Sequence, residues 1–411
     1  MDKRLLVLAS GMFAVGTDSF VVAGVLHQVS ASFGVSIALA GQMVTIYALS
    51  YAVLSPIIVA AAAHWPRKRL LLAGLAVFVL GNVATALAPT IGIVLISRLL
   101  AGLGAAMFSP TATAAGASLA PPERRGQALA IVIAGLSSAT ALGAPLGTFI
   151  GGWLDWRATM WFVSAVAMLA AMVVARYLRN VPTPPAVGLA RRLAPLGDAR
   201  VLQTLLTTWL AYSGLFLVYT YIGSTFDRAT GGDARELAGL LLLWGIAATI
   251  GNLIAGRLTD RFGSRAIINA AIVIVALDFA LLPWTSASLA TAAPALVVWG
   301  LCGWGLLVPQ QHRLVSITPT AAPLLLGLNS AAIYIGVSMS GLIGGVAITW
   351  FDRHALGLAG AAFIAAALLA AEWAHRRIAR PHRHPALNLE TDGQVEVRTL
   401  DLGSCERPAT T

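Results

Sequence analysis

The chain has 411 residues, of which 58% are hydrophobic and only 11% are charged, and its formal net charge is +10. A soluble protein of ordinary composition has about 25% charged residues, so this composition excludes a soluble globular protein. It predicts a polytopic helical membrane protein, whose positive charge reflects its orientation in the bilayer and not a nucleic-acid partner.

Twelve apolar windows of about 20 residues, each long enough to cross the hydrocarbon of a bilayer, are separated by Gly, Pro and charged clusters. The predicted transmembrane spans are 5–28, 37–61, 69–88, 90–115, 127–151, 157–178, 200–223, 235–256, 266–284, 290–311, 325–348 and 355–375. The first window is longer than the core of a signal peptide and no small-residue cleavage site follows it, so we interpret it as a span. The predicted fold class is an all-α membrane protein with twelve transmembrane helices.

Composition shifts divide the chain into four segments. We predict two six-helix halves, 1–178 and 200–375, because the segment 179–199 between them has four prolines and no apolar period. We interpret 179–199 as a cytoplasmic linker. From Arg376 the sequence turns polar, and 376–411 is predicted to be a disordered cytoplasmic tail whose basic start lies near anionic lipid headgroups.

The distribution of Lys and Arg predicts the orientation of the spans. With the N-terminus inside, 22 of the 27 basic residues lie in cytoplasmic segments, four lie outside, and the remaining one, Arg98, lies within a span. Basic residues accumulate on the cytoplasmic side of membrane proteins. Both termini are therefore predicted to be cytoplasmic.

Three landmarks recur in the same order in both halves. Pro66 matches Gly263 with an offset of 197 residues, and Gly102 matches Gly303 with an offset of 201. The glycine pair that ends "GAPLGTFIGG" in the fifth span matches the pair that ends "SGLIGG" in the eleventh, with an offset of 193. Nearly equal offsets predict two related halves with a central site between them, reached alternately from each side.

Arg98 lies inside the apolar stretch "LISRLLAGLGAAMFSP" of the fourth span, where an unpaired charge costs several kcal/mol. The repeat sets it opposite Trp299, so only the N-terminal half is expected to hold a buried charge. At about 1.5 Å per residue, Asp18 in the first span and Arg98 lie at similar depths, roughly 20 and 18 Å from the cytoplasmic side. We predict that these two side chains meet. Either Asp18 binds and releases a proton as its surroundings change, or the two form a static ion pair that holds two helices together.

Several motifs of the chain resemble those of the major facilitator superfamily. "GRLTDRFGSR" (256–265), "RLLAGLG" (98–104) and "GAPLGTFIGG" (143–152) resemble its loop signature, its span-4 arginine motif and its exporter motif. "GTDSFVVAGVLHQVSASFGVS" (16–36) resembles the first span of the drug:proton antiporter group. Within that group the chain is similar to bacterial purine base and nucleoside exporters, with chloramphenicol and sugar exporters close by.

The resemblance implies a fold of two pseudo-symmetric six-helix halves in a bacterial inner membrane. It implies a protein that functions as a monomer, with protons, membrane lipid and a small-molecule substrate as partners. The same resemblance assigns a cytoplasmic gate, which latches the halves in the outward-open state, to Arg257, Asp260, Arg261 and Arg265. It assigns a hinge that limits leak to Gly143, Pro145, Gly147, Gly151 and Gly152. Ordinary positive-inside anchoring and tight helix packing are the respective alternatives.

Polar and aromatic residues within the spans are candidates for substrate contact, because flat aromatic faces with amide groups suit a planar heteroaromatic such as a purine. These candidates are Gln42, Tyr47, Tyr212, Tyr219, Gln310, Asn329 and Tyr334. Packing within the bundle is the alternative for each of them. Two further acidic residues have simpler explanations. An interfacial position near Trp284 explains Asp278, with proton coupling as its alternative, and an i,i+4 ion pair with Arg376 explains Glu372.

We therefore predict a proton-coupled exporter (antiporter) of a small organic molecule, with purine bases, nucleosides and drugs as first candidates. A sugar or amphenicol exporter, or an importer or facilitator of the same fold, is the alternative. No metal-ligand spacing, nucleophile elbow or Walker A motif occurs in the sequence, so neither an enzyme nor an ATP-driven pump is favoured, and no cofactor or metal is expected.

Overall fold

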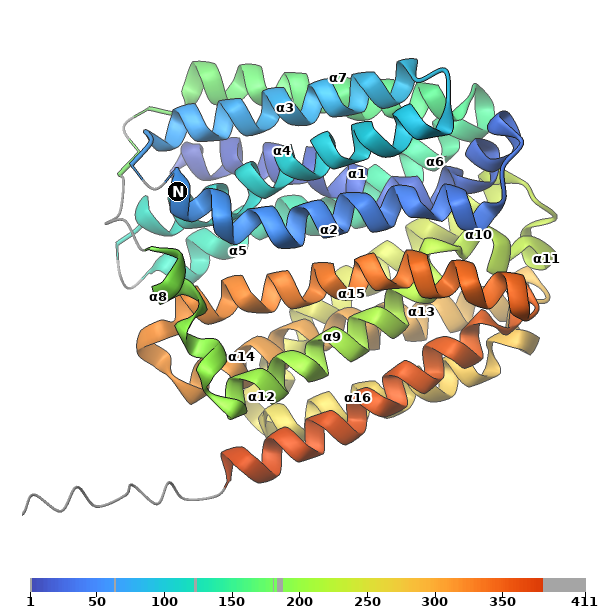
Figure 1. Cartoon of the computed structure of the whole chain (residues 1–411). Coiled ribbons are helices and arrows are strands. Elements are labelled where there is room, and N and C mark those ends of the chain that lie inside the picture. Colours follow the sequence, from blue (N-terminus) through green and yellow to red (C-terminus); the bar gives the residue numbers. More distant parts are fainter. Residues whose placement is uncertain (1, 63, 122–123, 180, 183–187, 380–411) are drawn as a thin grey trace, which may run out of the picture.

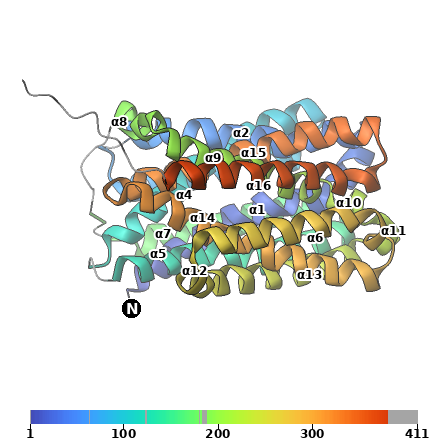
Figure 2. The ribbon, with the colours of Figure 1, turned by 90° about the horizontal axis from the view of Figure 1, so that it is seen from below.

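The computed structural model describes residues 2–62, 64–121, 124–179, 181–182 and 188–379. Every regular element within these segments is a helix. The long helices run along a common axis in two perpendicular views (Figure 1, Figure 2). Eleven helical stretches in the described part of the chain are long and apolar enough to span a membrane. The predicted all-α fold class is confirmed.

The N-terminal half contains six spans, the fifth of which is divided by a short π-helical segment. Its elements are α1 (Lys3–Phe33), α2 (Ile37–Ala61), α3 (Arg67–Leu87), α4 (Ile91–Ser118), α5 (Arg125–Ser138), η2 (Ala139–Gly143), α6 (Ala144–Trp153) and α7 (Trp156–Tyr177). The predicted span 37–61 coincides with α2. The short helices α8 (Leu189–Leu193) and η3 (Ala194–Gly197) lie in the segment predicted as a linker.

The C-terminal half is built from longer and more interrupted helices. Its elements are α9 (Ala199–Thr220), α10 (Ile222–Thr225), α11 (Asp227–Thr230), α12 (Ala234–Thr285), α13 (Leu289–Gly305), α14 (Leu307–Ile317), η4 (Pro319–Ala321), α15 (Ala322–Trp350), η5 (Arg353–Ala355) and α16 (Leu356–Ile378). Helix α16 extends past the predicted start of the tail. The rest of that tail, from 380, lies outside the described residues.

Helix α12 has 52 residues and holds two spans. Straight, it would be about 78 Å long, more than twice the hydrocarbon thickness. It is interrupted at Gly263, whose φ of 79° and ψ of 154° are not helical. We call the segments of α12 before and after Gly263 its first and second arm. Arg228, which precedes the first arm, donates to the carbonyl of Pro283 near the end of the second arm at 2.6 Å. The start and the end of α12 therefore lie together. The chain therefore crosses twelve times, and the predicted loop 257–265 is helical except at one glycine.

Local signals explain where the first two helices meet. Gly34 adopts a left-handed conformation with φ of 63°, and its N–H bonds to the carbonyls of Ala31 and Ser30 at the end of α1. Ser36 then begins α2, because its Oγ accepts the N–H of Leu39. This tight turn sets α1 and α2 antiparallel.

Figure 1 shows the N-terminal half, in blue to green, beside the C-terminal half, in yellow-green to red. The first turn of α1 and the last turn of α16 lie at the same end of the bundle, which we call the terminal end; the other is the opposite end. Helices α2 and α15 lie side by side along the boundary between the halves. Helix α12 packs across the same boundary on η2 and α6, and it makes few contacts with α5 near the terminal end.

Candidate functional site

A buried ion pair joins the first and fourth spans. Nη1 of Arg98 on α4 lies 2.9 Å from Oδ1 of Asp18 on α1, and the two side chains are 1% and 0% exposed. Charges at this distance in a dry interior attract each other strongly, although each has lost its hydration. The structure therefore brings together the two residues that the sequence analysis placed at similar depth.

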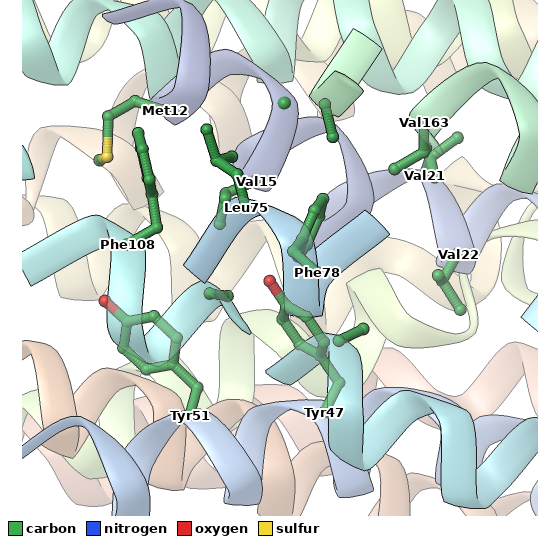
Figure 3. Close-up of a cluster of buried hydrophobic side chains, with 14 of the residues drawn as sticks. Met12, Val15, Val21, Val22, Tyr47, Tyr51, Leu75, Phe78, Phe108 and Val163 are labelled. Carbon is green, nitrogen blue, oxygen red and sulfur yellow. The ribbon is translucent and has the colours of Figure 1, made fainter. Parts of the chain in front are cut away.

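Polar and aromatic groups from two further helices surround the pair. Oδ1 of Asn82 on α3 accepts a hydrogen bond from Nη1 of Arg98 at 3.3 Å. The ring of Tyr47 on α2 lies 4.6 Å from Cζ of Arg98, a distance at which an aromatic face stabilises a cation. The Tyr47 hydroxyl lies 3.0 Å from Oγ of Ser19. Figure 3 shows Tyr47 reaching from α2 to the side of Phe78. The guanidinium is thus held from three helices.

Two atoms of the pair have no hydrogen-bond partner among the described residues: Oδ2 of Asp18 and Nε of Arg98. A buried polar atom without a partner costs about 1–3 kcal/mol. Oδ2 is therefore an acceptor whose lone pairs are available to a proton or to a water molecule. Breaking the pair by neutralising Asp18 also leaves Arg98 with Asn82 and Tyr47 around it. This arrangement is chemically suited to proton binding as well as to helix anchoring.

The structure distributes the predicted substrate contacts over several places. Tyr212 and Tyr219 on α9 line a small, mostly apolar cavity within the C-terminal half. The residues that line it are Tyr212, Leu215, Phe216, Tyr219, Trp244, Trp299, Gly303 and Trp304. Tyr47 lies at the ion pair instead. Tyr334 on α15 stacks on Tyr51 of α2 across the boundary between the halves, with ring centroids 3.8 Å apart.

Gln310 and Asn329 belong to a separate buried network. Nε2 of Gln310 donates to Oγ1 of Thr208 at 2.9 Å, and Thr208 donates to Oδ1 of Asn329 at 2.8 Å. This network ties α9, α14 and α15 together inside the C-terminal half. Gln42 lies elsewhere again, since its Nε2 donates to the carbonyl of Gly341 on α15 at 3.3 Å. The seven predicted residues therefore do not form one pocket.

The two halves are sealed against each other toward the opposite end. The hydroxyl of Tyr221, which follows α9, donates to the carbonyl of Gly341 at 2.6 Å, and a Cβ at Gly41 would collide with that hydroxyl. A Cβ at Gly345 would lie 3.0 Å from Cβ of Ala38 on α2. Helices this close leave no room for a substrate to pass. We call Gly41, Gly341, Gly345 and Tyr221 the glycine–tyrosine seal.

The predicted gate residues lie around the break in α12 at the terminal end. Arg257, Asp260 and Arg261 are exposed and form no ion pair within the described segments. Arg265 pairs with Glu372 on α16, Nη2 to Oε2, at 2.7 Å. With the described part of the N-terminal half, none of these four residues forms a hydrogen bond or an ion pair.

Glu372 corrects one prediction. Its expected partner was Arg376 on the same helix, but Arg265 from the second arm of α12 takes that place with two parallel bonds, Nε to Oε1 at 3.0 Å and Nη2 to Oε2 at 2.7 Å. Asn269 also donates to Oε1 at 2.5 Å. A bidentate guanidinium contact is stronger and better oriented than a single i,i+4 pair, which explains the outcome.

The predicted hinge residues form a face of the fifth span that packs on α1. A Cβ at Gly143 would meet Thr17, and one at Gly147 would meet Val21. A Cβ at Gly151 would lie 2.8 Å from Cγ1 of Val25, and one at Gly152 would meet Ala234 of the C-terminal half. Pro145 follows η2, the π-helical segment that interrupts this span. The pattern brings the fifth span against α1 and, at its end, against α12.

Arg313 also corrects a prediction, because the C-terminal half holds a buried charge too. Helix α14 continues to Ile317, beyond the predicted limit of the tenth span, and Arg313 is only 5% exposed. It donates to the carbonyl of Ala371 at 3.2 Å and to Oγ1 of Thr207 at 3.3 Å. Sequence analysis also missed Asn82. The sequence signal that could have identified it is a polar amide side chain within the apolar third span.

The sequence comparisons agree with this fold. The profile of the Major Facilitator Superfamily matches residues 8–321 and 204–398. The chain is 31% identical over 355 residues to the MFS-type transporter YtbD of Bacillus subtilis (strain 168), covering 83% of this chain and 87% of that protein. It is 28% identical over 349 residues to the inner membrane transport protein YdhP of Escherichia coli (strain K12), covering 85% of this chain and 90% of that protein.

Solved structures of low sequence identity share the fold. The D-xylose-proton symporter superposes with a TM-score of 0.74 at 19% identity, covering 90% of this chain and 96% of that one. A bacterial homolog of the human lysosomal transporter Spinster, in an inward-facing and occupied conformation, superposes with a TM-score of 0.72 at 18% identity, covering 91% and 96%.

Proposed function

Because the chain belongs to the Major Facilitator Superfamily, we propose that it is a proton-coupled antiporter that exports a small organic molecule by alternating access. That it is a multi-pass membrane transporter follows from the family and from its relatives. The observation that carries the finer proposal is the buried contact between Asp18 and Arg98, 2.9 Å apart, with one carboxylate oxygen that has no partner among the described residues.

Asp18 is the proposed proton carrier. In this proposal Asp18 releases its proton when it meets Arg98 and binds one when the two separate. Alternating access supplies such a change, because the helices that hold the pair line one side of the proposed transport path. Each proton that moves down the membrane potential supplies about 2.3 kcal/mol per 100 mV, and this energy drives the substrate outward.

The proposed orientation has both termini in the cytoplasm of a bacterial cell. The glycine–tyrosine seal then faces the periplasm. A conformation closed at this end is proposed to be one that exchanges substrate with the cytoplasm. Arg257, Asp260 and Arg261 form no ion pair with the described residues and are proposed to latch the halves when the terminal end closes.

The proposed substrates are planar heteroaromatic molecules such as purine bases and nucleosides. The decisive test uses inverted vesicles with an acidic interior, in which an exporter takes up substrate driven by the outward movement of protons. Labelled nucleobases, amphenicols and sugars are compared. We expect gradient-driven uptake of a nucleobase or nucleoside by the wild-type chain, and its loss in Asp18→Asn.

The matched control is Asp278→Asn, which removes another carboxylate from a span without touching Arg98. Full gradient-driven uptake by Asp18→Asn would eliminate Asp18 as the carrier. Gradient-driven uptake only in right-side-out vesicles would establish an importer, and uptake of sugars or amphenicols in place of nucleobases would replace the proposed substrate class.

A further inference from the structure

The start of α3 carries a buried arginine that has no counter-charge among the described residues. Arg67, the first residue of this helix, is only 5% exposed, and its Nε is buried without a hydrogen-bond partner in the described segments. It forms no ion pair with any residue that the structure describes. Burying a charge is costly unless the charge is paired. The position of Arg67 therefore favours binding of an anion.

The first turn of α3 adds further donors at the same place. Pro66 precedes the helix, and its carbonyl accepts the N–H groups of Arg69 and Leu70. The N–H groups of Arg67 and Lys68 bond to none of the described residues, and no side chain caps the helix. Such N–H groups, together with the helix dipole, attract anions. Because side chains lean toward the N-terminus of their helix, that of Arg67 is directed toward this turn.

A second guanidinium comes from the segment between the two halves. Figure 1 shows α8 at the terminal end, where it packs on α2 and α15. Arg192 on α8 is half-buried. Burial lowers the pKa of the Arg192 guanidinium, and the positive charge of nearby Arg67 lowers it further. Two like charges therefore lie close together, and an anion between them would offset their repulsion.

The acidic residues of the neighbouring segments bind other arginines. Asp2, before α1, pairs with Arg4 at 2.6 Å, and Asp198, before α9, pairs with Arg200 at 2.7 Å. No carboxylate in the described part of the chain is paired with Arg67. The neutralising charge is therefore expected to come from a ligand.

A phosphate group suits these donors better than a carboxylate does. A guanidinium is a planar fork that binds two oxygens of a phosphate with parallel hydrogen bonds. A phosphate has enough oxygens to accept from two guanidinium groups and from the N–H groups of α3, whereas a carboxylate has only two. Inorganic phosphate also carries more than one negative charge at neutral pH, and an anionic lipid headgroup presents the same phosphate oxygens.

We propose that Arg67, Arg192 and the first turn of α3 form a binding site for a phosphate group, supplied either by the headgroup of an anionic lipid or by inorganic phosphate. The bound phosphate joins α3 of the N-terminal half to α8, which also contacts α15 of the C-terminal half. It therefore stabilises the arrangement of the halves at the terminal end. The site requires neither the proposed substrate nor the proposed direction of transport.

The test measures the thermal midpoint of the full-length chain in detergent. One arm adds sodium phosphate, with sodium chloride of equal ionic strength and pH as its reference. The other arm adds dioleoylphosphatidylglycerol, with dioleoylglycerol, which lacks the phosphate, as its reference. We expect the midpoint of the wild type to rise by about 2 °C or more in at least one arm. A rise with sodium phosphate identifies the soluble source, and a rise with the phospholipid alone identifies the headgroup.

Arg67→Met should abolish this rise. Its midpoint without ligand should equal or exceed that of the wild type, because the substitution removes a buried charge that lies beside another of the same sign. Arg67→Lys keeps the charge but loses the planar fork, and it should raise the apparent Kd about tenfold. Arg69→Met is the matched control, since Arg69 belongs to the same turn and is exposed. It should keep the full rise.

The proposal is overturned if neither sodium phosphate nor the phospholipid raises the midpoint of the wild type above its reference. It is also overturned if Arg67→Met responds like the wild type, or if Arg69→Met loses the response to the same extent. Should Arg67→Met fail to fold, Arg192→Gln provides the same test from α8. Its response should be largely lost, and an undiminished response would overturn the proposal as well.

Discussion

Oδ1 of Asn82 lies 3.3 Å from Nη1 of Arg98, the same nitrogen that binds Asp18 at 2.9 Å. Asp18 and Asn82 therefore share one donor group of the guanidinium, from α1 and from α3. When Asp18 is neutralised, Arg98 keeps its amide partner and the ring of Tyr47. In the proposed mechanism the arginine is the fixed member of the pair, and the aspartate is the member that changes.

A double-mutant cycle on the pair should show strong coupling. Asp18→Asn leaves a buried guanidinium without its counter-charge, and Arg98→Met leaves a buried carboxylate, so each is expected to lower the free energy of unfolding by about 3–5 kcal/mol. The double variant should be less destabilised than the sum of the two, by at least about 1 kcal/mol. Thermal unfolding in detergent measures all four proteins. Simple additivity would mean that the two charges do not stabilise each other.

Asn82→Ala should reduce transport while it preserves the ion pair. The substitution removes the amide that holds Arg98 when Asp18 is protonated, at a cost of about 1.5–3 kcal/mol for a hydrogen bond to a charged group. We expect a lower rate of gradient-driven uptake with nearly unchanged substrate affinity. Thr85→Val is the control, because Thr85 lies one turn away and bonds to Ser97 at 2.7 Å and not to Arg98. An equal loss in both variants would exclude a specific role for Asn82.

Tyr221→Phe should weaken the glycine–tyrosine seal. The hydroxyl of Tyr221 lies against Gly41 of the N-terminal half, whereas its 2.6 Å bond to the carbonyl of Gly341 stays within the C-terminal half. Removing the hydroxyl loosens the contact across the boundary, and we expect it to shift the conformational equilibrium toward opening at the opposite end by about two- to tenfold. A cysteine placed at Thr45 should react faster with a membrane-impermeant maleimide added to whole cells. Tyr177→Phe, an exposed tyrosine of the other end, is the comparison. Unchanged labelling would show that Tyr221 does not hold the seal.

Gly147→Val should destabilise the packing of the fifth span on α1. Its side chain would overlap Val21, and overpacking of this kind typically costs about 1–3 kcal/mol. Gly126→Ala on the same span has nothing within 4 Å of the added Cβ and should leave the thermal midpoint unchanged. An unchanged thermal midpoint in Gly147→Val would contradict the close approach of these two helices.

The stability of the protein is expected to depend on pH through Asp352, at the opposite end of the C-terminal half. The backbone N–H of His354 donates to Asp352 and holds the pKa of that carboxyl below its usual value. A depressed pKa in the folded state contributes stability above the ordinary Asp value of about 3.9, and this contribution is lost as the pH falls through the lower folded-state pKa. Asp352→Asn should therefore lower the thermal midpoint slightly at pH 7, and the difference should vanish at strongly acidic pH. A difference that persists there would assign the effect to packing.

Much of the fold was predictable because apolar length and charge breaks determine spans. Helix α2 coincides with its predicted window, and Asp18 and Arg98 were placed at similar depth by counting residues along two helices. The turn at Gly263 was not predictable, because a charged stretch of ten residues indicates a loop. Its residues remain helical, since a single glycine with positive φ suffices to reverse the chain.

Partners across helices were harder to predict than positions along them. Glu372 has a suitable arginine four residues away, but the choice of Arg265 depends on how the arms of α12 lie beside α16. The small cavity of the C-terminal half is a second example. Tyr212 and Tyr219, which line it, were selected from the sequence, but Trp244 and Trp299 come from other spans and no charge singled them out. Asn82 was overlooked for the same reason.

The reversal at Gly263 gives α12 a helical elbow where the sequence predicted a loop. Asp260 sits in the last helical turn before this elbow and Arg265 in the first turn after it, where Glu372 ties it to α16. Neither residue is able to reach a distant partner by loop motion. If Asp260 forms a contact that closes the terminal end, the C-terminal half must rotate as a rigid unit to bring it there. The presence of that contact would then depend directly on the angle between the two halves.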